Sequence, residues 1–235
     1  MKQYFYLFLS LIFLTNGCSR EKNIEGEIFI VTQGGQNLKL GLVTVGLISR
    51  EAFTRHLDSK IKIASEIIQP IYTSYKQLED SISLLGKLND ELEQKKNSLE
   101  IYNNDDKMLA LLKKKLWVAR KNLDLTIRIA PLQQIYRTYT SGAFFLNESP
   151  PFSDSTKTNS DGQFNFMVQK SEKYFIIASA ARLVGNSSEC YYWVVDYPNP
   201  SFRKNEKILL GNDNLFDPLK LLNLENSQTQ KSSKI

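Results

Sequence analysis

The chain has few of the residue types on which catalytic and metal sites depend. Its 235 residues include one histidine, His56, and two cysteines, Cys18 and Cys190. A histidine cluster for a metal ion and a Ser-His-Asp triad would both depend on His56, and no second ligand type stands at metal spacing from it. None of the many carboxylates is marked out by an apolar setting that would raise its pKa. The composition therefore predicts a protein that is not an enzyme and that uses no cofactor or metal.

A strong net charge and a membrane-spanning run are also lacking. The formal charge of +5 is small and spread among 30 basic and 25 acidic residues, which does not predict nucleic acid as a partner. The apolar run from Tyr4 to Leu14, interrupted only by Ser10, is too short to cross a bilayer of about 30 Å. Because Lys2 precedes this run, residues 1–17 are predicted to be a signal peptide. We therefore expect an exported protein.

The end of this segment carries a recognisable motif. The stretch Leu14–Cys18 resembles the lipobox of bacterial lipoproteins, in which a small residue precedes a cysteine that receives lipid. The resemblance implies that Cys18 is the lipid attachment site. Residues 18–24 would then be a linker between the membrane anchor and the β domain. Ser19, in place of an aspartate, fits sorting to the outer membrane of a Gram-negative envelope. Thr15 departs from the family's branched aliphatic residue, so ordinary cleavage with an unmodified Cys18 is the alternative.

The second cysteine has no partner if Cys18 carries lipid. Cys190 opens the apolar run Cys190–Val195, which favours a buried and inert thiol. A disulfide with Cys18 is the alternative in an exported chain. The aromatic residues from Tyr191 to Phe202 could form a binding platform, although one parity of a strand is normally core.

A long insert between residues 49 and 142 dominates the rest of the chain. Apolar residues recur there at alternating spacings of three and four, which is typical of a coiled-coil seam. The seam positions of the first helix are Leu57, Ile61, Ala64, Ile68, Ile71, Tyr75, Leu78, Ile82, Leu85, Asn89, Leu92, Lys96 and Leu99. We therefore predict an antiparallel helical hairpin.

The polar cluster Tyr102–Asp106 interrupts this spacing and is the predicted tip of the hairpin, with its turn centred near residues 103 and 104. Pro70 and Pro131 then lie within two turns of each other, which predicts a shared bend or break. Gly142 is expected to end the second helix. The seam positions predicted for the second helix are Leu109, Leu112, Leu116, Ala119, Leu123 and Ile127 and, after Pro131, Leu132, Ile135, Tyr136 and Tyr139.

The hairpin is expected to project. An arm of about 45 residues reaches on the order of 65 to 70 Å, which is longer than a small β domain is wide. Helices that fold back over the β domain are the alternative. The run Lys113, Lys114 and Lys115 near the tip is a possible contact for an acidic partner, or else a solvated helix face.

Short β-type stretches flank the insert at residues 25–48 and 143–218. The predicted strand Leu38–Ile48 changes parity at Gly41, where we expect a bulge. Beyond the insert, Asp161-Gly162 predicts a tight turn before a strand. Several short strands at this spacing predict an antiparallel sandwich. The polar residues 219–235 have little to bury and are predicted to be a largely disordered tail.

These stretches resemble a known family. The segments that carry the resemblance are Gly26–Val31, Leu38–Leu47, Thr158–Phe164 and Tyr174–Ala180. They are similar to the carboxypeptidase regulatory-like domain, a transthyretin-like β-sandwich. Thr158, Gly162 and Phe164 match its turn motif, and Asn159 stands at the usual aspartate position. The resemblance implies an antiparallel transthyretin-like β-sandwich, and the large helical insertion departs from the ordinary domain. With the hairpin predicted from the spacing, the expected fold is α+β, a transthyretin-like β-sandwich interrupted by a long antiparallel coiled-coil hairpin. Because the family is non-catalytic, it implies no active-site residues.

Together these features favour a non-catalytic, envelope-anchored lipoprotein whose hairpin contacts an unknown protein partner or a second copy of the chain. A periplasmic adaptor of a transport or secretion system is the second interpretation, because membrane fusion proteins also interrupt a β domain with a helical hairpin. The stretch Gly35–Gly41 echoes their lipoyl-domain turn, but no second lipoyl half follows the hairpin. A hydrolase is the third interpretation.

Overall fold

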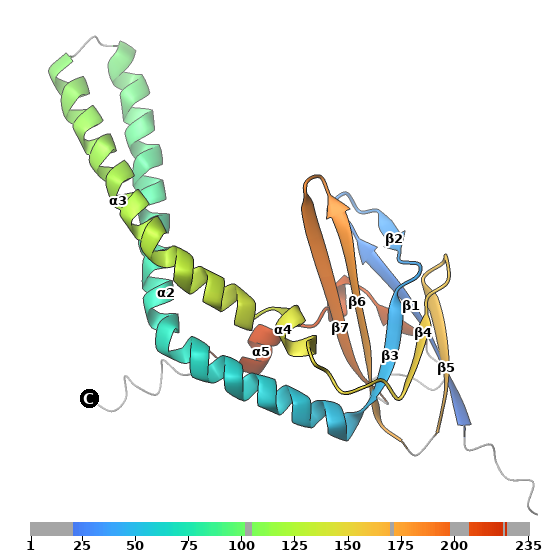
Figure 1. The fold of residues 1–235 in the computed structure, drawn as a ribbon. Coiled ribbons are helices and arrows are strands. Elements are labelled where there is room, and N and C mark those ends of the chain that lie inside the picture. Colours follow the sequence, from blue (N-terminus) through green and yellow to red (C-terminus); the bar gives the residue numbers. More distant parts are fainter. Residues whose placement is uncertain (1–20, 102–104, 170–171, 198–206, 223, 225–235) are drawn as a thin grey trace, which may run out of the picture. The chain divides into compact units, whose positions relative to one another are not determined.

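The computed structural model of the protein describes residues 21–101, 105–169, 172–197, 207–222 and 224 (Figure 1). The chain divides into two compact units. The sandwich unit comprises Met1–Leu57 and Glu148–Phe216, and the helical unit comprises Asp58–Asn147 and Asp217–Ile235. Strands and long helices occur together in the chain, so the predicted α+β class is confirmed.

The first sheet of the sandwich unit is built on β1. Its strands are β1 (Glu21–Val31), β2 (Asn37–Lys39), β5 (Gln163–Gln169) and β8 (Ile208–Leu210). β1 pairs antiparallel with β2 and β5 and parallel with β8, so the last pairing departs from the expected antiparallel arrangement. Residues 21–24, expected in a linker, form the start of β1, where Ile24 lies opposite Phe166.

The second sheet joins segments from both sides of the helical insert. Its strands are β3 (Thr44–Ser49), β4 (Asp154–Lys157), β6 (Tyr174–Val184) and β7 (Ser187–Tyr197). Their order is β4-β3-β6-β7, and all the pairings are antiparallel. Since β3 precedes the insert and β4 and β6 follow it, the two flanking segments fold as one body.

Inward-facing side chains of both sheets form a single core. The first sheet contributes Ile24, Ile28, Ile30, Phe164, Phe166 and Val168, and the second contributes Val45, Leu47, Ile176, Trp193 and Val195. The alternation of buried and exposed residues along β5 follows from the two-residue period of a strand. Trp193 is fully buried, and its Nε1–H donates to the Gly211 carbonyl at 2.9 Å. The two sheets therefore pack face to face as a sandwich.

The predicted strand Leu38–Ile48 is two strands in two different sheets. β2 ends at Lys39 and β3 begins at Thr44, and Leu42 between them has φ of 62°. A bulge at Gly41 was the wrong interpretation of the parity change, because the chain crosses here from one sheet to the other. The buried Thr158 hydroxyl donates to the Leu40 carbonyl at 2.7 Å and accepts from the Val43 N–H at 2.9 Å.

The helices occupy the insert and the C-terminal region. They are α2 (Arg50–Ile101), α3 (Asp105–Tyr139), α4 (Gly142–Leu146) and α5 (Pro218–Leu222), with a 3-10 helix η1 at Asn212–Asn214. The predicted helix end at Gly142 is wrong: α3 ends at Tyr139, and the Ser141 hydroxyl caps α4 by accepting from the Phe144 N–H at 3.2 Å. α5 takes up the start of the predicted tail, and residues 225–235 lie outside the described residues.

The two prolines lie inside helices without ending them. Pro70 is within α2 and Pro131 within α3, so the predicted break does not occur. Figure 1 shows both helices bending part-way along their length, which is the expected effect of an internal proline. Close to these positions the Tyr136 ring of α3 stacks on Tyr72 and Tyr75 of α2, with centroids 6.2 and 4.7 Å apart. This aromatic cluster holds the bent helices together.

Removing the Thr158 hydroxyl should destabilise the sandwich unit. Thr158→Val should lower its free energy of unfolding by about 1 to 3 kcal/mol, because the Leu40 carbonyl and the Val43 N–H lose a buried partner. Urea unfolding can be followed by Trp193 fluorescence in a Trp117→Phe background. Thr158→Ser keeps the hydroxyl and is the control. Equal losses in both variants would show that packing of the methyl group, and not the hydrogen bonds, matters at this position.

Candidate functional site

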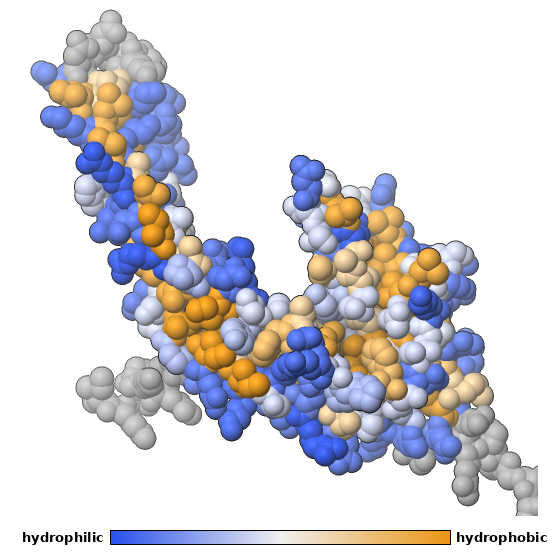
Figure 2. All heavy atoms as spheres, viewed as in Figure 1, coloured by the Kyte–Doolittle hydropathy of each residue, from blue (hydrophilic) through white to orange (hydrophobic). Residues whose placement is uncertain are grey.

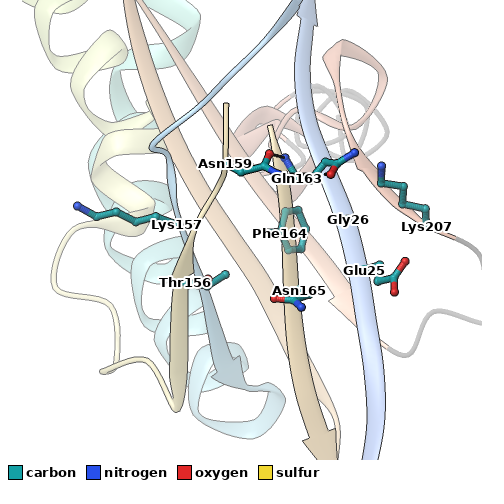
Figure 3. A pocket seen from close by; sticks show the side chains of 9 residues that line it. All are labelled: Glu25, Gly26, Thr156, Lys157, Asn159, Gln163, Phe164, Asn165 and Lys207. Carbon is teal, nitrogen blue, oxygen red and sulfur yellow. Dashed lines mark hydrogen bonds between the residues drawn. The ribbon is translucent and has the colours of Figure 1, made fainter. Parts of the chain in front are cut away.

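A polar groove of about 520 Å³ lies on the sandwich beside strands β1, β4 and β5 (Figure 3). The lining residues are Glu25, Gly26, Thr156, Lys157, Asn159, Gln163, Phe164, Asn165 and Lys207. A Cβ on Gly26 would lie 2.0 Å from Cζ of the buried Phe164 ring, so the ring packs directly on the backbone of β1 and closes the groove beneath.

The charges near this groove are paired internally. Glu27 accepts from Lys207 Nζ at 2.7 Å and lies 3.1 Å from Lys39 Nζ. These hydrogen bonds, first from Lys207 and then from Lys39, hold the pKa of Glu27 below its usual value. The single carboxylate that lines the groove, Glu25, accepts from the Asn23 amide at 2.8 Å. The described lining therefore offers amide, hydroxyl and lysine groups for hydrogen bonds and a single carboxylate, Glu25, but no pair of carboxylates for acid-base catalysis.

The seam between α2 and α3 lies close to the predicted register. Leu92 of α2 packs with Leu111 and Val118 of α3 in one buried cluster. Glu93 forms an ion pair with Lys115, and Tyr72 stacks on Tyr136. Both pairs are symmetric about position 104, within one residue of the predicted turn centre. Of the thirteen positions predicted for the first helix, Asn89 is exposed, Leu99 is not described, and the others are buried or half-buried.

The seam predicted for the second helix is wrong before Pro131. After it, the predicted positions are half-buried, and Tyr136 stacks on α2. The residues of α3 that turn toward α2 are Leu111, Val118, Leu125 and Ile129, which are all buried. Among the predicted positions, Leu109, Leu112, Leu116, Leu123 and Ile127 are exposed to between 45% and 65%, and Ala119 is exposed as well. We call these five large side chains the α3 stripe. Figure 2 shows hydrophobic atoms in a line along α3 between hydrophilic neighbours.

A second groove of about 520 Å³ lies between the two helices. Trp117 and Leu84 line it and are 57% and 68% exposed. Lys121 and Arg128 of α3 line it as well. At about 100° per residue, Trp117 is turned well away from the α3 stripe. The hairpin therefore carries two separate apolar surfaces in addition to its seam.

The predicted contact Lys113, Lys114 and Lys115 does not form one face. Lys113 and Lys114 are exposed, whereas Lys115 is half-buried and bonds to Glu93 of α2. Successive residues of a helix point in directions about 100° apart, so a run of three cannot share one surface. The predicted lipid attachment site, Cys18, lies outside the described residues.

Other singled-out residues have structural surroundings. His56 stacks on Phe53, with ring centroids 5.8 Å apart. Cys190 is exposed, so the predicted burial is wrong. Trp193 and Tyr197 of β7 face the core of the sandwich, and Cys190 has the other parity along the strand and points outward. Because these two aromatic residues are buried, they cannot belong to an exposed binding platform.

The described part of the chain contains no cluster of three or more His, Cys, Asp or Glu side chains able to hold a metal ion. Among the helices described, none combines the length and apolar character needed to span a bilayer. In comparisons with known proteins, no family model, no curated protein and no solved structure matches the chain.

The pairing of Glu27 predicts a loss of stability in acid. A carboxyl group whose pKa is lowered by folding stabilises the folded state above its unfolded pKa, near 4.5, and this contribution disappears as the pH falls through the folded value. Glu27→Gln should therefore reduce stability at neutral pH and flatten the pH dependence below about 4.5, measured by urea unfolding at each pH. Glu25→Gln, which alters a carboxylate with no ion pair in the structure, is the control. An unchanged acid profile in Glu27→Gln would exclude this linkage.

Proposed function

We propose that the chain is a non-catalytic, lipid-anchored protein of the cell envelope that binds another protein chain through the outer surface of α3. The observation that carries this proposal is the α3 stripe. Large aliphatic side chains on a solvated helix are normally isolated, but these five recur at spacings of three, four, seven and four residues, which keep them on one face as in a helix-packing seam. The stripe from Leu109 to Ile127 extends over about 27 Å at 1.5 Å per residue.

The position of the stripe suits a protein partner. It lies on a helix already held against α2 by a separate buried row, with Leu111 and Val118 packed against Leu92. Binding therefore needs no rearrangement of the hairpin. Amphipathic helices bind partners through apolar anchors at i, i+3, i+4 and i+7, which is the spacing that Leu109, Leu112 and Leu116 provide.

The envelope location rests on the sequence features at residues 1–18. A charged residue, a short apolar run and a lipobox-like cysteine support export followed by lipidation on Cys18, with anchoring in the outer membrane. The lining of the sandwich groove fits a non-catalytic role, because its one hydroxyl group, Thr156, has no histidine among the lining residues and its one carboxylate, Glu25, has no second carboxylate beside it. The sandwich unit would then serve as the support for the hairpin.

We also propose that the sandwich is of the transthyretin-like kind found in carboxypeptidase regulatory-like domains. The turn that carries the resemblance has features that support it. Gly162 has φ of 72°, and a Cβ there would lie 2.4 Å from the Ile28 carbonyl oxygen. The Asn159 side-chain oxygen accepts from the N–H groups of Asp161 and Gln163 at 3.0 and 2.9 Å. An aspartate, the residue usual in the family, could accept the same two hydrogen bonds.

Crosslinking from defined positions tests the interaction. A photoreactive residue at Leu112 should give a discrete crosslinked protein band in intact cells, and Leu116→Glu should abolish that band, because a charge on the stripe would have to be desolvated on binding. The matched control is a photoreactive residue at Leu84, on the other exposed surface of the hairpin, together with Leu84→Glu. If Leu112 and Leu84 label the same proteins to the same extent, the stripe is not the binding surface.

The lipid anchor has its own test. In a Gram-negative host, Cys18→Ser should shift the protein from the detergent-phase membrane fraction to the soluble fraction, because the change removes the acyl chains that hold it in the membrane. Intact mass measurement of the parent chain should show a diacylglyceryl-sized addition on the peptide that begins at Cys18. Cys190→Ser should change neither result. Recovery of the unmodified parent chain in the soluble fraction would exclude lipidation.

A further inference from the structure

We infer that the groove between α2 and α3 is the docking site for an acidic amphipathic helix of another protein, which would lie along the hairpin as a third helix. This groove is lined by Trp117 and Leu84 and is turned well away from the α3 stripe. The inference therefore goes beyond the proposed function, which concerns the stripe. It is carried by the apolar surface of the groove and by a row of basic residues along α3.

The groove exposes apolar surface that a partner would cover. Leu78 and Leu85 of α2 line it and are half-buried, and Leu125 of α3 lines it and is buried. Trp117 and Leu84 also line it, and both are more than half exposed. Tryptophan is among the residues most enriched at the energetic centres of protein interfaces. An exposed tryptophan beside aliphatic side chains therefore favours a protein as the occupant.

The length of the groove suits a helix. Its lining runs from Trp117 to Arg128 on α3 and from Ser74 to Leu85 on α2, which is about 17 Å along each helix at 1.5 Å per residue. An amphipathic helix that binds in a groove directs apolar residues at i, i+3, i+4 and i+7 into it. Three helical turns of such a partner would cover the lining from end to end.

The α3 wall of the groove is basic. Lys121 and Arg128 line it. Lys114 lies seven residues before Lys121, and Lys107 a further seven residues before that, so all four recur on nearly the same face of the helix. All four residues are exposed. Together they extend over about 32 Å at 1.5 Å per residue, so the basic row continues beyond the groove toward the tip of the hairpin.

Acidic residues do not cancel this row. No carboxylate is among the lining residues of the groove. The nearest acid of α3 is Asp124, which lies 3.9 Å from Arg128 and points about 60° outward from Lys121 at 100° per residue. Among the described residues, neither Lys114 nor Lys121 has an ion-pair partner. The row therefore presents positive charge to whatever enters the groove.

The α2 wall of the groove is polar but uncharged. Its polar lining residues are Ser74, Gln77 and Ser81, and the Ser81 hydroxyl donates to the Gln77 carbonyl of its own helix at 2.7 Å. Asp80 and Glu91 of α2 are exposed but do not line the groove. A bound helix would therefore place its acidic side chains against α3 and uncharged side chains against α2.

The spacing of the basic row distinguishes between possible occupants. A fatty acid has one anionic head and would engage one of these charges, whereas a helix with acids at seven-residue intervals meets Lys114, Lys121 and Arg128 in turn. Residues 225–235 of this chain contain one glutamate and two lysines, so their charge does not suit the row. Neither α2 nor α3 has acids at three successive positions seven residues apart, so a second copy does not supply the matching helix either.

Synthetic helices test this chemistry. The acidic probe is a three-heptad peptide with leucine at its a and d positions, glutamate on one flank and glutamine on the other. The basic probe has lysine in place of each glutamate. Each is titrated into the full chain in mild detergent, with detergent alone as the blank, and the emission of Trp117 is followed, because Trp193 is buried in the sandwich core. The acidic probe should shift the emission to shorter wavelength, and Trp117→Phe should abolish the shift.

Charge reversal on the row is the deciding comparison, measured by fluorescence anisotropy of labelled probes. Lys114→Glu combined with Lys121→Glu should weaken binding of the acidic probe by about tenfold or more and make the basic probe the preferred one. The matched control is Lys113→Glu combined with Arg120→Glu, which makes the same change in net charge at exposed residues that do not line the groove. The control variant should still prefer the acidic probe.

The apolar contact has a separate pair of variants. Trp117→Ala should weaken binding of the acidic probe by about tenfold. Leu116→Ala, on the α3 stripe, should leave it unchanged. Since both side chains are exposed, neither change removes a core contact of the hairpin.

The outcomes separate this inference from the proposed function. Preference for the acidic probe that reverses with the row supports the inference. Equal binding of both probes, equal losses in the row variant and its control, or no binding of either probe overturns it. A shift of Trp117 emission with dodecanoate but with neither probe would show that the groove takes a lipid, which also overturns it. Crosslinking from Leu112 reports on the stripe alone and decides the proposed function in every case.

Discussion

The hydrogen bonds of Thr158 are the interaction on which the sandwich unit depends. Between β2 and β3 the chain crosses from one sheet to the other, and Thr158 pairs with the backbone from Leu40 to Val43 along this crossing. Besides the two bonds of its hydroxyl group, Thr158 donates its own N–H to the Val43 carbonyl at 2.9 Å and accepts from the Leu42 N–H at 3.0 Å. One residue thus pairs with four backbone polar groups of the crossing segment. Because Thr158 follows the helical insert and Leu42 precedes it, these bonds also join the two parts of the chain.

This closure explains how the sandwich accepts so long an insert. β3, which ends at Ser49, pairs directly with β4, which begins at Asp154, so the chain leaves and re-enters the sheet at neighbouring strands. The entropy of closing a loop grows only with the logarithm of its length. The core around Trp193 is made entirely of strands and does not need the hairpin to fill it. The insert is therefore free to carry surfaces that serve a purpose other than the stability of the sandwich.

Strand positions and the α2 seam could be predicted because each has a single apolar row. Phe164, Phe166 and Val168 alternate without ambiguity, and the α2 row includes the buried Ala64, Ile68 and Leu92. On α3 the sequence holds two apolar rows about 150° apart at 100° per residue, and spacing alone cannot say which one faces α2. For the same reason, spacing alone assigns the residues of the α3 stripe to the seam and not to an exposed surface. The sequence does hold one sign of a second surface on α3. Leu111 and Val118 are seven residues apart and form a second apolar row, which a hairpin with a single seam would leave without a role. Cys190 was misplaced because an apolar run on an edge strand has both parities, and only tertiary packing shows which one is inside.

The second row on α3 has a physical consequence for the hairpin itself. A pair of helices can bury only one row of each partner, and isolated helices of this kind gain most of their stability from packing. The buried cluster of Leu92, Leu111 and Val118 is small, and near Pro70 and Pro131 the packing continues as the stack of Tyr136 on Tyr72 and Tyr75. Covering the stripe with a partner chain would bury this second row of α3 as well. The exposed row thus supplies what the isolated hairpin lacks, a second buried face on α3.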